Sequence, residues 1–222
     1  MADLKDISKQ KISQVMTPLK AGQFLLLGLL WLLGCIPVIT AGASTCAVFY
    51  VGIKILNDEP GLKICRLFFK GIKQNFVQGL LMFLISIITL GGLGALIVWA
   101  IISEQSLFII VLAACCGFVA FVFNVFAYPL IARYENSFVN VLRNVIALMF
   151  TYLTEAVKLC VILAVYIAID VLLFRLNLIA GFVSLLFWPS VIFYTICYRL
   201  FAIFYKVEHP IKYDENGDPI SE

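Results

Sequence analysis

The chain has 222 residues, of which 63% are hydrophobic and only 13% are charged. A soluble globular domain has roughly 45–50% apolar and about 25% charged residues, so this composition excludes one. The net charge of +3 is not gathered on a soluble folded face, as nucleic-acid binding would require. At about 20 residues for each membrane crossing, the chain holds at most about six or seven spans with short loops. The sequence therefore predicts an all-α, polytopic membrane protein.

Six apolar runs predict about six transmembrane helices, at residues 21–36, 38–56, 77–102, 107–130, 148–173 and 178–204. Pro37 marks the turn between the first two, because proline donates no backbone hydrogen bond and disfavours helix at the preceding residue. The first run also has features of a secretion signal, but a cleaved signal normally precedes a polar mature chain. We therefore expect this helix to be retained, within a single transmembrane domain that covers residues 21–206.

Positively charged residues indicate the orientation of these spans. Short cytoplasmic loops carry an excess of Lys and Arg. If both termini are cytoplasmic, 15 of the 16 Lys and Arg residues fall on the cytoplasmic side, and only Arg175 lies on the other. The sequence thus predicts N-in and C-in, with a cytoplasmic N-terminal segment at 1–20 and a polar cytoplasmic tail at 207–222.

Residues 62–76 predict a basic amphipathic elbow helix between the second and third spans. Placed at 100° per residue, its basic and apolar side chains separate onto opposite arcs. The basic arc holds Lys63, Arg66, Lys70 and Lys73, and the apolar arc holds Ile64, Phe68, Phe69, Ile72 and Phe76. Such a helix either lies in the layer of anionic lipid headgroups or docks a protein partner.

A second elbow helix is predicted from a possible internal repeat. An offset of 69 residues aligns Phe69 with Phe138 and Asn75 with Asn144, the only identical pairs in that alignment. The same offset relates residues 38–102 to 107–171, so that both units read span, elbow, span in the same direction. Some transporter folds show parallel repeats of this kind.

Three polar side chains are candidates for a site at or near membrane depth. Asp170 and Arg175 lie toward the outer end of the fifth span, and Asn124 lies in the fourth. An ionisable group at membrane depth is a functional candidate, because it is costly to leave without a partner. An ion pair, or extension of both side chains to the lipid headgroups, would satisfy Asp170 and Arg175. The alternative is a solute or proton contact, with Asn124 as a further residue of a solute cavity.

The motifs predict no enzyme, cofactor or metal site. The single histidine, His209, lies in the polar tail, so a histidine metal cluster or a Ser–His triad is excluded. Neither the phosphate-binding GxxxxGK[ST] motif nor GxGxxG occurs. Six of the seven cysteines lie in apolar runs and none forms a CxxC pair, so they are expected to act as small apolar residues.

The stretch from Trp31 to Phe76 carries a more specific pattern. Residues 36–45 read IPVITAGAST and residues 68–76 read FFKGIKQNF. This combination resembles the YesL family of bacterial integral membrane proteins, by motif over the first third of the chain and by span pattern beyond it.

The resemblance implies two groups of functional residues. The first-hairpin motif would shape the proline turn, with hydroxyl groups that hydrogen-bond to free backbone groups. This motif comprises Trp31, Pro37, Thr40, Gly42 and Thr45. The resemblance also implies an elbow that faces lipid or a partner, at Phe68, Phe69, Lys70, Lys73, Asn75 and Phe76.

The same resemblance implies a function. Members are multi-pass plasma-membrane proteins of Gram-positive bacteria, often encoded beside carbohydrate ABC importers and their sensor kinases. The leading hypothesis is therefore an accessory or regulatory subunit of an oligosaccharide ABC importer, with its permease subunits as possible partners. The chain lacks the Glu-Ala-Ala…Gly loop by which permeases contact their ATPases. An independent small-solute transporter or channel, and a membrane partner of a sensor kinase, are the alternatives.

Overall fold

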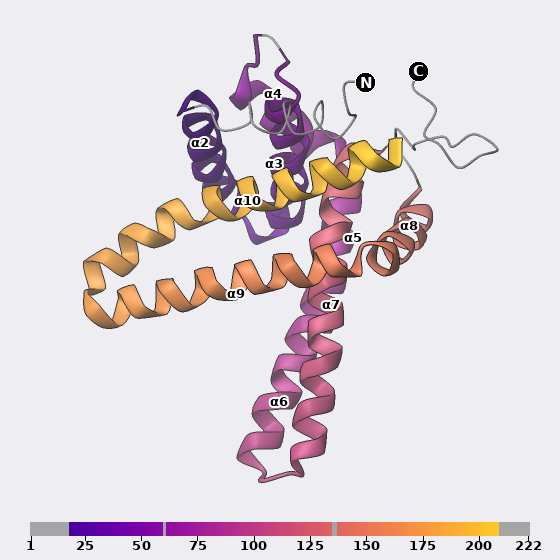
Figure 1. Ribbon diagram of the computed structural model, residues 1–222, viewed down its shortest axis with the longest axis vertical. Coiled ribbons are helices and arrows are strands. Elements are labelled where there is room, and N and C mark those ends of the chain that lie inside the picture. The colour runs from indigo at the N-terminus through magenta and orange to yellow at the C-terminus, as the bar shows by residue number, and fades with distance from the viewer. Residues whose placement is uncertain (1–17, 60, 135–136, 209–222) are drawn as a thin grey trace, which may run out of the picture.

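The computed structural model describes residues 18–59, 61–134 and 137–208, which form helices and no strand (Figure 1). The N-terminal half comprises α2 (Pro18–Cys35), the short 3₁₀ helix η1 (Val38–Thr40), α3 (Ala41–Leu56), α4 (Ile64–Gln74), α5 (Phe76–Ser86), the π-helical segment η2 (Ile87–Gly91) and α6 (Gly92–Ile102). The C-terminal half comprises α7 (Leu107–Arg133), α8 (Phe138–Thr151), α9 (Leu153–Leu176) and α10 (Leu178–Glu208). Most of the predicted terminal segments 1–20 and 207–222, His209 included, lies outside the described residues.

The long apolar helices indicate a membrane protein. Within its described part, four helical segments are long and apolar enough to cross a membrane: Val38–Leu56, Phe76–Ile102, Leu107–Arg133 and Leu153–Leu176. The first and sixth predicted spans are also helical, as α2 and α10. The all-α prediction is confirmed, whereas six crossings and cytoplasmic termini stay predictions.

Both predicted elbow helices are present, as α4 and α8. The predicted start of the fifth span was wrong by a few residues, because α8 continues to Thr151 and α9 begins only at Leu153. The two elbows join the following helix in a similar way. Asn75 separates α4 from α5 and Tyr152 separates α8 from α9, each with a backbone outside the helical region.

The core lies where α2, α3 and α10 meet the inner parts of α5 and α7. Its fully buried side chains include Phe24 on α2, Phe126 on α7 and Phe204 on α10. Glycines bring the helices close together: a Cβ atom on Gly42 of α3 would lie 2.1 Å from the carbonyl oxygen of Gly79 on α5. Small residues at such crossings let two backbones approach within the membrane.

Two hairpins leave this core in different directions (Figure 1). The α6–α7 hairpin runs downward in the view, and the α9–α10 hairpin extends to the side. Only 11% of the most apolar stretch of α9 is buried, against 61% of the stretch that contains α3. The hairpins therefore present apolar surface that lipid or another protein must cover.

The helix boundaries favour a different register for the possible repeat. α3 and α7 end at residues 56 and 133, and the two elbow junctions lie at residues 75 and 152, so both pairs are 77 residues apart. The offset of 69 residues instead pairs the junction at Asn75 with Asn144, which lies inside α8. The order helix, elbow, helix recurs, and the repeat itself stays a prediction.

Candidate functional site

The first-hairpin motif forms a hydrogen-bonded turn between α2 and α3. The hydroxyl of Thr40 donates to the carbonyl of Gly34 at 2.6 Å and also lies 2.8 Å from the carbonyl of Pro37. Ser44 donates to the same Gly34 carbonyl at 3.0 Å. The Gly34 carbonyl lies in the last turn of α2, where carbonyls lack partners within the helix, and a membrane offers no water to satisfy it.

Trp31 connects the two helices above this turn. Its indole Nε1–H donates to the hydroxyl of Thr45 at 3.0 Å, and Thr45 in turn donates to the carbonyl of Ala41 at 2.9 Å. The ring of Trp31 also packs edge-on against Phe193 of α10, at a centroid distance of 5.1 Å. The motif thus holds α2, α3 and α10 together, and any role in binding a partner stays a prediction.

The elbow helix α4 uses its apolar face within the chain. Ile64, Phe68 and Gly71 are buried, and a Cβ atom on Gly71 would lie 3.1 Å from Ala47 of α3. The prediction that Phe68 faces lipid or a partner was therefore wrong, because its ring is only 1% exposed and belongs to the core. Its neighbour Phe69 is 64% exposed.

The other predicted elbow residues lie at the outer side of α4 or at its end. Lys70 and Lys73 are exposed, whereas Asn75 and Phe76 are half-buried at the junction with α5. The side-chain amide of Asn75 donates to the carbonyl of Gly71 at 3.1 Å. Asn75 therefore ends the elbow helix by satisfying a carbonyl of its last turn.

Asn124 belongs to a polar cluster between α5 and α7. The hydroxyl of Ser86 lies within hydrogen-bonding distance of the Asn124 side-chain oxygen and 3.3 Å from the hydroxyl of Tyr128. The Asn124 amide donates to the carbonyl of Ala120 at 2.8 Å. The sequence identified Asn124 but neither Ser86 nor Tyr128. Ser86 precedes Asn124 by 38 residues and Tyr128 by 42 residues along the chain.

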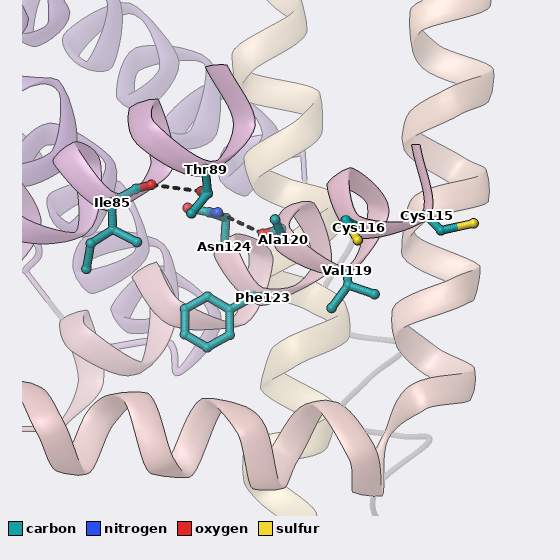
Figure 2. A pocket seen from close by; sticks show the side chains of 8 residues that line it. All are labelled: Ile85, Thr89, Cys115, Cys116, Val119, Ala120, Phe123 and Asn124. Carbon is teal, nitrogen blue, oxygen red and sulfur yellow. Dashed lines mark hydrogen bonds between the residues drawn. The ribbon is translucent and has the colours of Figure 1, made fainter. Parts of the chain in front are cut away.

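This cluster borders a pocket of about 480 Å³ (Figure 2). Ile85 of α5 and Thr89 of the π-helical segment η2 form one wall, and α7 forms the other wall with Cys115, Cys116, Val119, Ala120, Phe123 and Asn124. Thr89 donates to the carbonyl of Ile85 at 2.7 Å, so its hydroxyl is already bonded within its own helix. A wall that is mostly apolar suits a hydrocarbon chain better than a sugar, whose hydroxyl groups need several convergent polar partners.

Asp170 is bonded within the α9–α10 hairpin. Its Oδ1 atom accepts hydrogen bonds from the hydroxyl of Ser184 and the indole Nε1–H of Trp188, both on α10. The ring of Tyr166, one turn before Asp170, packs at a tilt against Trp188 with a centroid distance of 4.8 Å, and its hydroxyl lies 3.3 Å from the hydroxyl of Thr195. The polar side chains of this hairpin therefore face one another rather than the surroundings.

The structure does not join the three predicted solute-site residues. Asp170 forms no ion pair with Arg175 within the described part of the chain. The Arg175 side chain is exposed and lies outside the cluster that Asp170 forms with residues of α10. The ion-pair interpretation is therefore wrong for this structure, since α10 supplies the partners of Asp170. Asn124 lies in a separate cluster on α7.

Ion pairs gather at the opposite end of the same hairpin and near the end of α3. Glu155 binds Lys158 at 2.7 Å and also lies 3.5 Å from Arg199, which connects α9 to α10. Asp58 binds Lys20 of α2 at 2.8 Å, where the Lys20 side chain is only 8% exposed. Glu59 binds Lys54 at 2.9 Å. Asp58 and Glu59, which follow α3, are thus paired with lysines that do not belong to α4.

No group of three or more His, Cys, Asp or Glu residues in the described ranges could hold a metal ion.

Comparison with known proteins gives one match. Residues 24–102 match a membrane-protein family described as "Protein of unknown function, DUF624". The matched part extends from α2 to the end of α6 and so contains the first hairpin, the elbow helix α4 and η2. Neither the curated proteins nor the solved structures contain a match to this chain. The narrower likeness to YesL stays a prediction.

Proposed function

We propose that the protein is an accessory or regulatory membrane subunit that packs its α9–α10 hairpin against the transmembrane helices of another complex. The resemblance in the first third of the chain suggests a carbohydrate ABC importer in a Gram-positive plasma membrane as that complex. The observation that carries the proposal is the hairpin itself, which extends away from the core with only 11% of its most apolar α9 stretch buried (Figure 1).

The inside of the hairpin supports this role. Asp170, Ser184 and Trp188 satisfy one another between α9 and α10, and the Glu155–Arg199 pair connects the two helices at the other end. The hairpin is therefore organised before it meets a partner, which lowers the entropic cost of binding. Its outward side chains are apolar and exposed, including Val161, Val165 and Ile169.

The outer surface of α9 also offers a place for close helix packing. Ala164 and Ala168 are exposed and lie one turn apart, so they share a face. Two small residues at this spacing allow another transmembrane helix to approach closely. Lipid chains can adjust to a bulky side chain at these positions, whereas a packed partner helix cannot.

The experiment purifies the tagged chain from its native membrane in a mild detergent and identifies bound proteins by mass spectrometry. We expect importer permease subunits in stoichiometric amount with the wild-type chain. Ala168→Trp should reduce their recovery about tenfold or more, because overpacking a helix interface costs roughly 1–3 kcal/mol. Ala114→Trp, at an exposed position of α7 in the other hairpin, is the matched control and should leave recovery unchanged.

Two results would contradict the proposal. Recovery of the chain alone from every sample would favour an independent transporter, which reconstituted solute flux would then test. Equal recovery of a partner with Ala168→Trp and Ala114→Trp would show that the hairpin is not the contact surface. Recovery of a sensor kinase in place of permeases would retain the accessory role but change its partner.

A further inference from the structure

The outward face of α4 carries a stripe of four basic side chains. Lys63 precedes the helix and is followed by Arg66, Lys70 and Lys73, at intervals of three, four and three residues. At about 100° per residue, these positions lie within an arc of roughly 80° and extend about 15 Å along the helix. All four side chains are exposed.

This stripe lacks acidic neighbours. Residues 61–76 contain no Asp or Glu, and none of the four basic residues forms an ion pair with a described residue. The nearest acidic residues along the chain, Asp58 and Glu59, bind Lys20 and Lys54 instead. The positive charge of the stripe is therefore available to an anion from outside the chain.

The connections of α4 place it at a membrane surface. The membrane-spanning segment Val38–Leu56 ends shortly before α4, and the segment Phe76–Ile102 begins directly after it. Gly71 on the buried side of α4 lies against α3, and Phe68, which is also buried, lies near Gly34 of α2, roughly opposite the basic stripe. The stripe thus faces away from the protein, at the level where the chain leaves and re-enters the bilayer.

Phe69 adds an apolar contact next to the stripe. It is 64% exposed and lies about 40° around the helix from Lys73. Basic residues that flank an exposed aromatic ring are typical of helices that bind the boundary between headgroups and acyl chains. We infer that the basic stripe of α4 binds the phosphate groups of anionic phospholipids, independently of any protein partner of the hairpin.

The test uses the purified full-length chain and counts bound lipids by native mass spectrometry. Phosphatidylglycerol and phosphatidylcholine with the same acyl chains are titrated separately. The stripe predicts a clear preference for phosphatidylglycerol that weakens as salt is raised, because salt screens exposed charges. Lys70→Gln should weaken phosphatidylglycerol binding about fivefold, and Lys70→Gln with Lys73→Gln about 25-fold.

The matched control is Arg143→Gln, which removes one exposed positive charge from the other elbow helix, α8. It should change phosphatidylglycerol binding less than twofold, and Lys70→Arg with Lys73→Arg should retain wild-type binding. Equal affinity for the two lipids, or equal loss with Lys70→Gln and Arg143→Gln, would overturn the inference. Competition by millimolar inorganic phosphate, or loss of an acidic protein without loss of lipid, would also overturn it.

Discussion

At the residue scale, small side chains and hydroxyl groups determine how the first hairpin closes. Gly42 allows α5 to lie directly against α3, and Thr40 and Ser44 satisfy the carbonyl of Gly34. At the glycine, a larger side chain would collide with backbone atoms of the neighbouring helix. At the hydroxyl residues, an apolar side chain would leave a carbonyl without a partner in the membrane. Adding one methyl group or removing one hydroxyl group in this hairpin should therefore lower the stability of the protein.

Gly42→Ala should lower the stability of the protein measurably. The new Cβ atom would lie 2.1 Å from the carbonyl oxygen of Gly79, so the two helices must move apart. We expect a loss of about 1–3 kcal/mol, seen as a lower thermal unfolding temperature in detergent. Gly94→Ala is the control, because a Cβ atom there meets nothing within 4 Å; an equal loss in both variants would contradict the close contact.

Thr45→Val should weaken the connection between α2 and α3. It removes the hydroxyl that accepts the indole N–H of Trp31, and an unpaired buried donor costs about 1–3 kcal/mol. Thr45→Ser keeps the hydroxyl and should retain most of the stability. Chemical or thermal unfolding of the two variants in the same detergent measures the difference, and identical curves would argue against the bond.

At the element scale, two pairs of helices each keep polar residues together. Ser86, Asn124 and Tyr128 do so between α5 and α7, beside the π-helical segment η2. Asp170, Ser184 and Trp188 do so between α9 and α10. Because a polar group without a partner is costly inside a membrane, each cluster fixes the register of the two helices that form it.

Asp170→Leu should destabilise the α9–α10 hairpin more than Asp170→Asn. Leucine removes the acceptor of both the Trp188 indole and the Ser184 hydroxyl, whereas asparagine keeps an acceptor oxygen. We expect the leucine variant to lose about 1–3 kcal/mol and the asparagine variant to lose less, as measured by thermal unfolding. Exchanging the charges of Asp170 and Arg175 should not restore stability, and full recovery in that double variant would revive the ion-pair interpretation.

Sequence patterns predicted the helices of these elements well but not their partners. Long apolar runs and the amphipathic pattern of residues 62–76 indicate helices because each carries the signal in its own residues, so the long helices and α4 could be located. The second elbow, α8, was located only through the 69-residue offset, which the helix boundaries do not follow. The bonds of Asp170 depend on the packing of α9 against α10, and its partners lie 14 and 18 residues further along the chain. Similarly, helical spacing placed Phe68 and Phe69 on one face, and only packing against α3 separates the buried ring from the exposed one.

At the scale of the whole molecule, the inferred lipid contact of α4 determines on which side of the membrane the following loop lies. Lipid binding by α4 places this elbow helix at the cytoplasmic surface, where positive charge is concentrated. The segment Phe76–Ile102 begins directly after α4 and is long enough to cross the membrane. The loop between α6 and α7, at residues 103–106, should then lie on the other side.

Labelling with a membrane-impermeant thiol reagent tests this arrangement most directly. Cys65 on α4 is exposed and serves as a natural reporter, with Cys65→Ser to identify its signal. Gln105→Cys reports the loop between α6 and α7. The predicted result is labelling of Gln105→Cys in intact cells and of Cys65 only after the membrane is opened. Labelling of Cys65 in intact cells, or protection of Gln105→Cys, would contradict the arrangement.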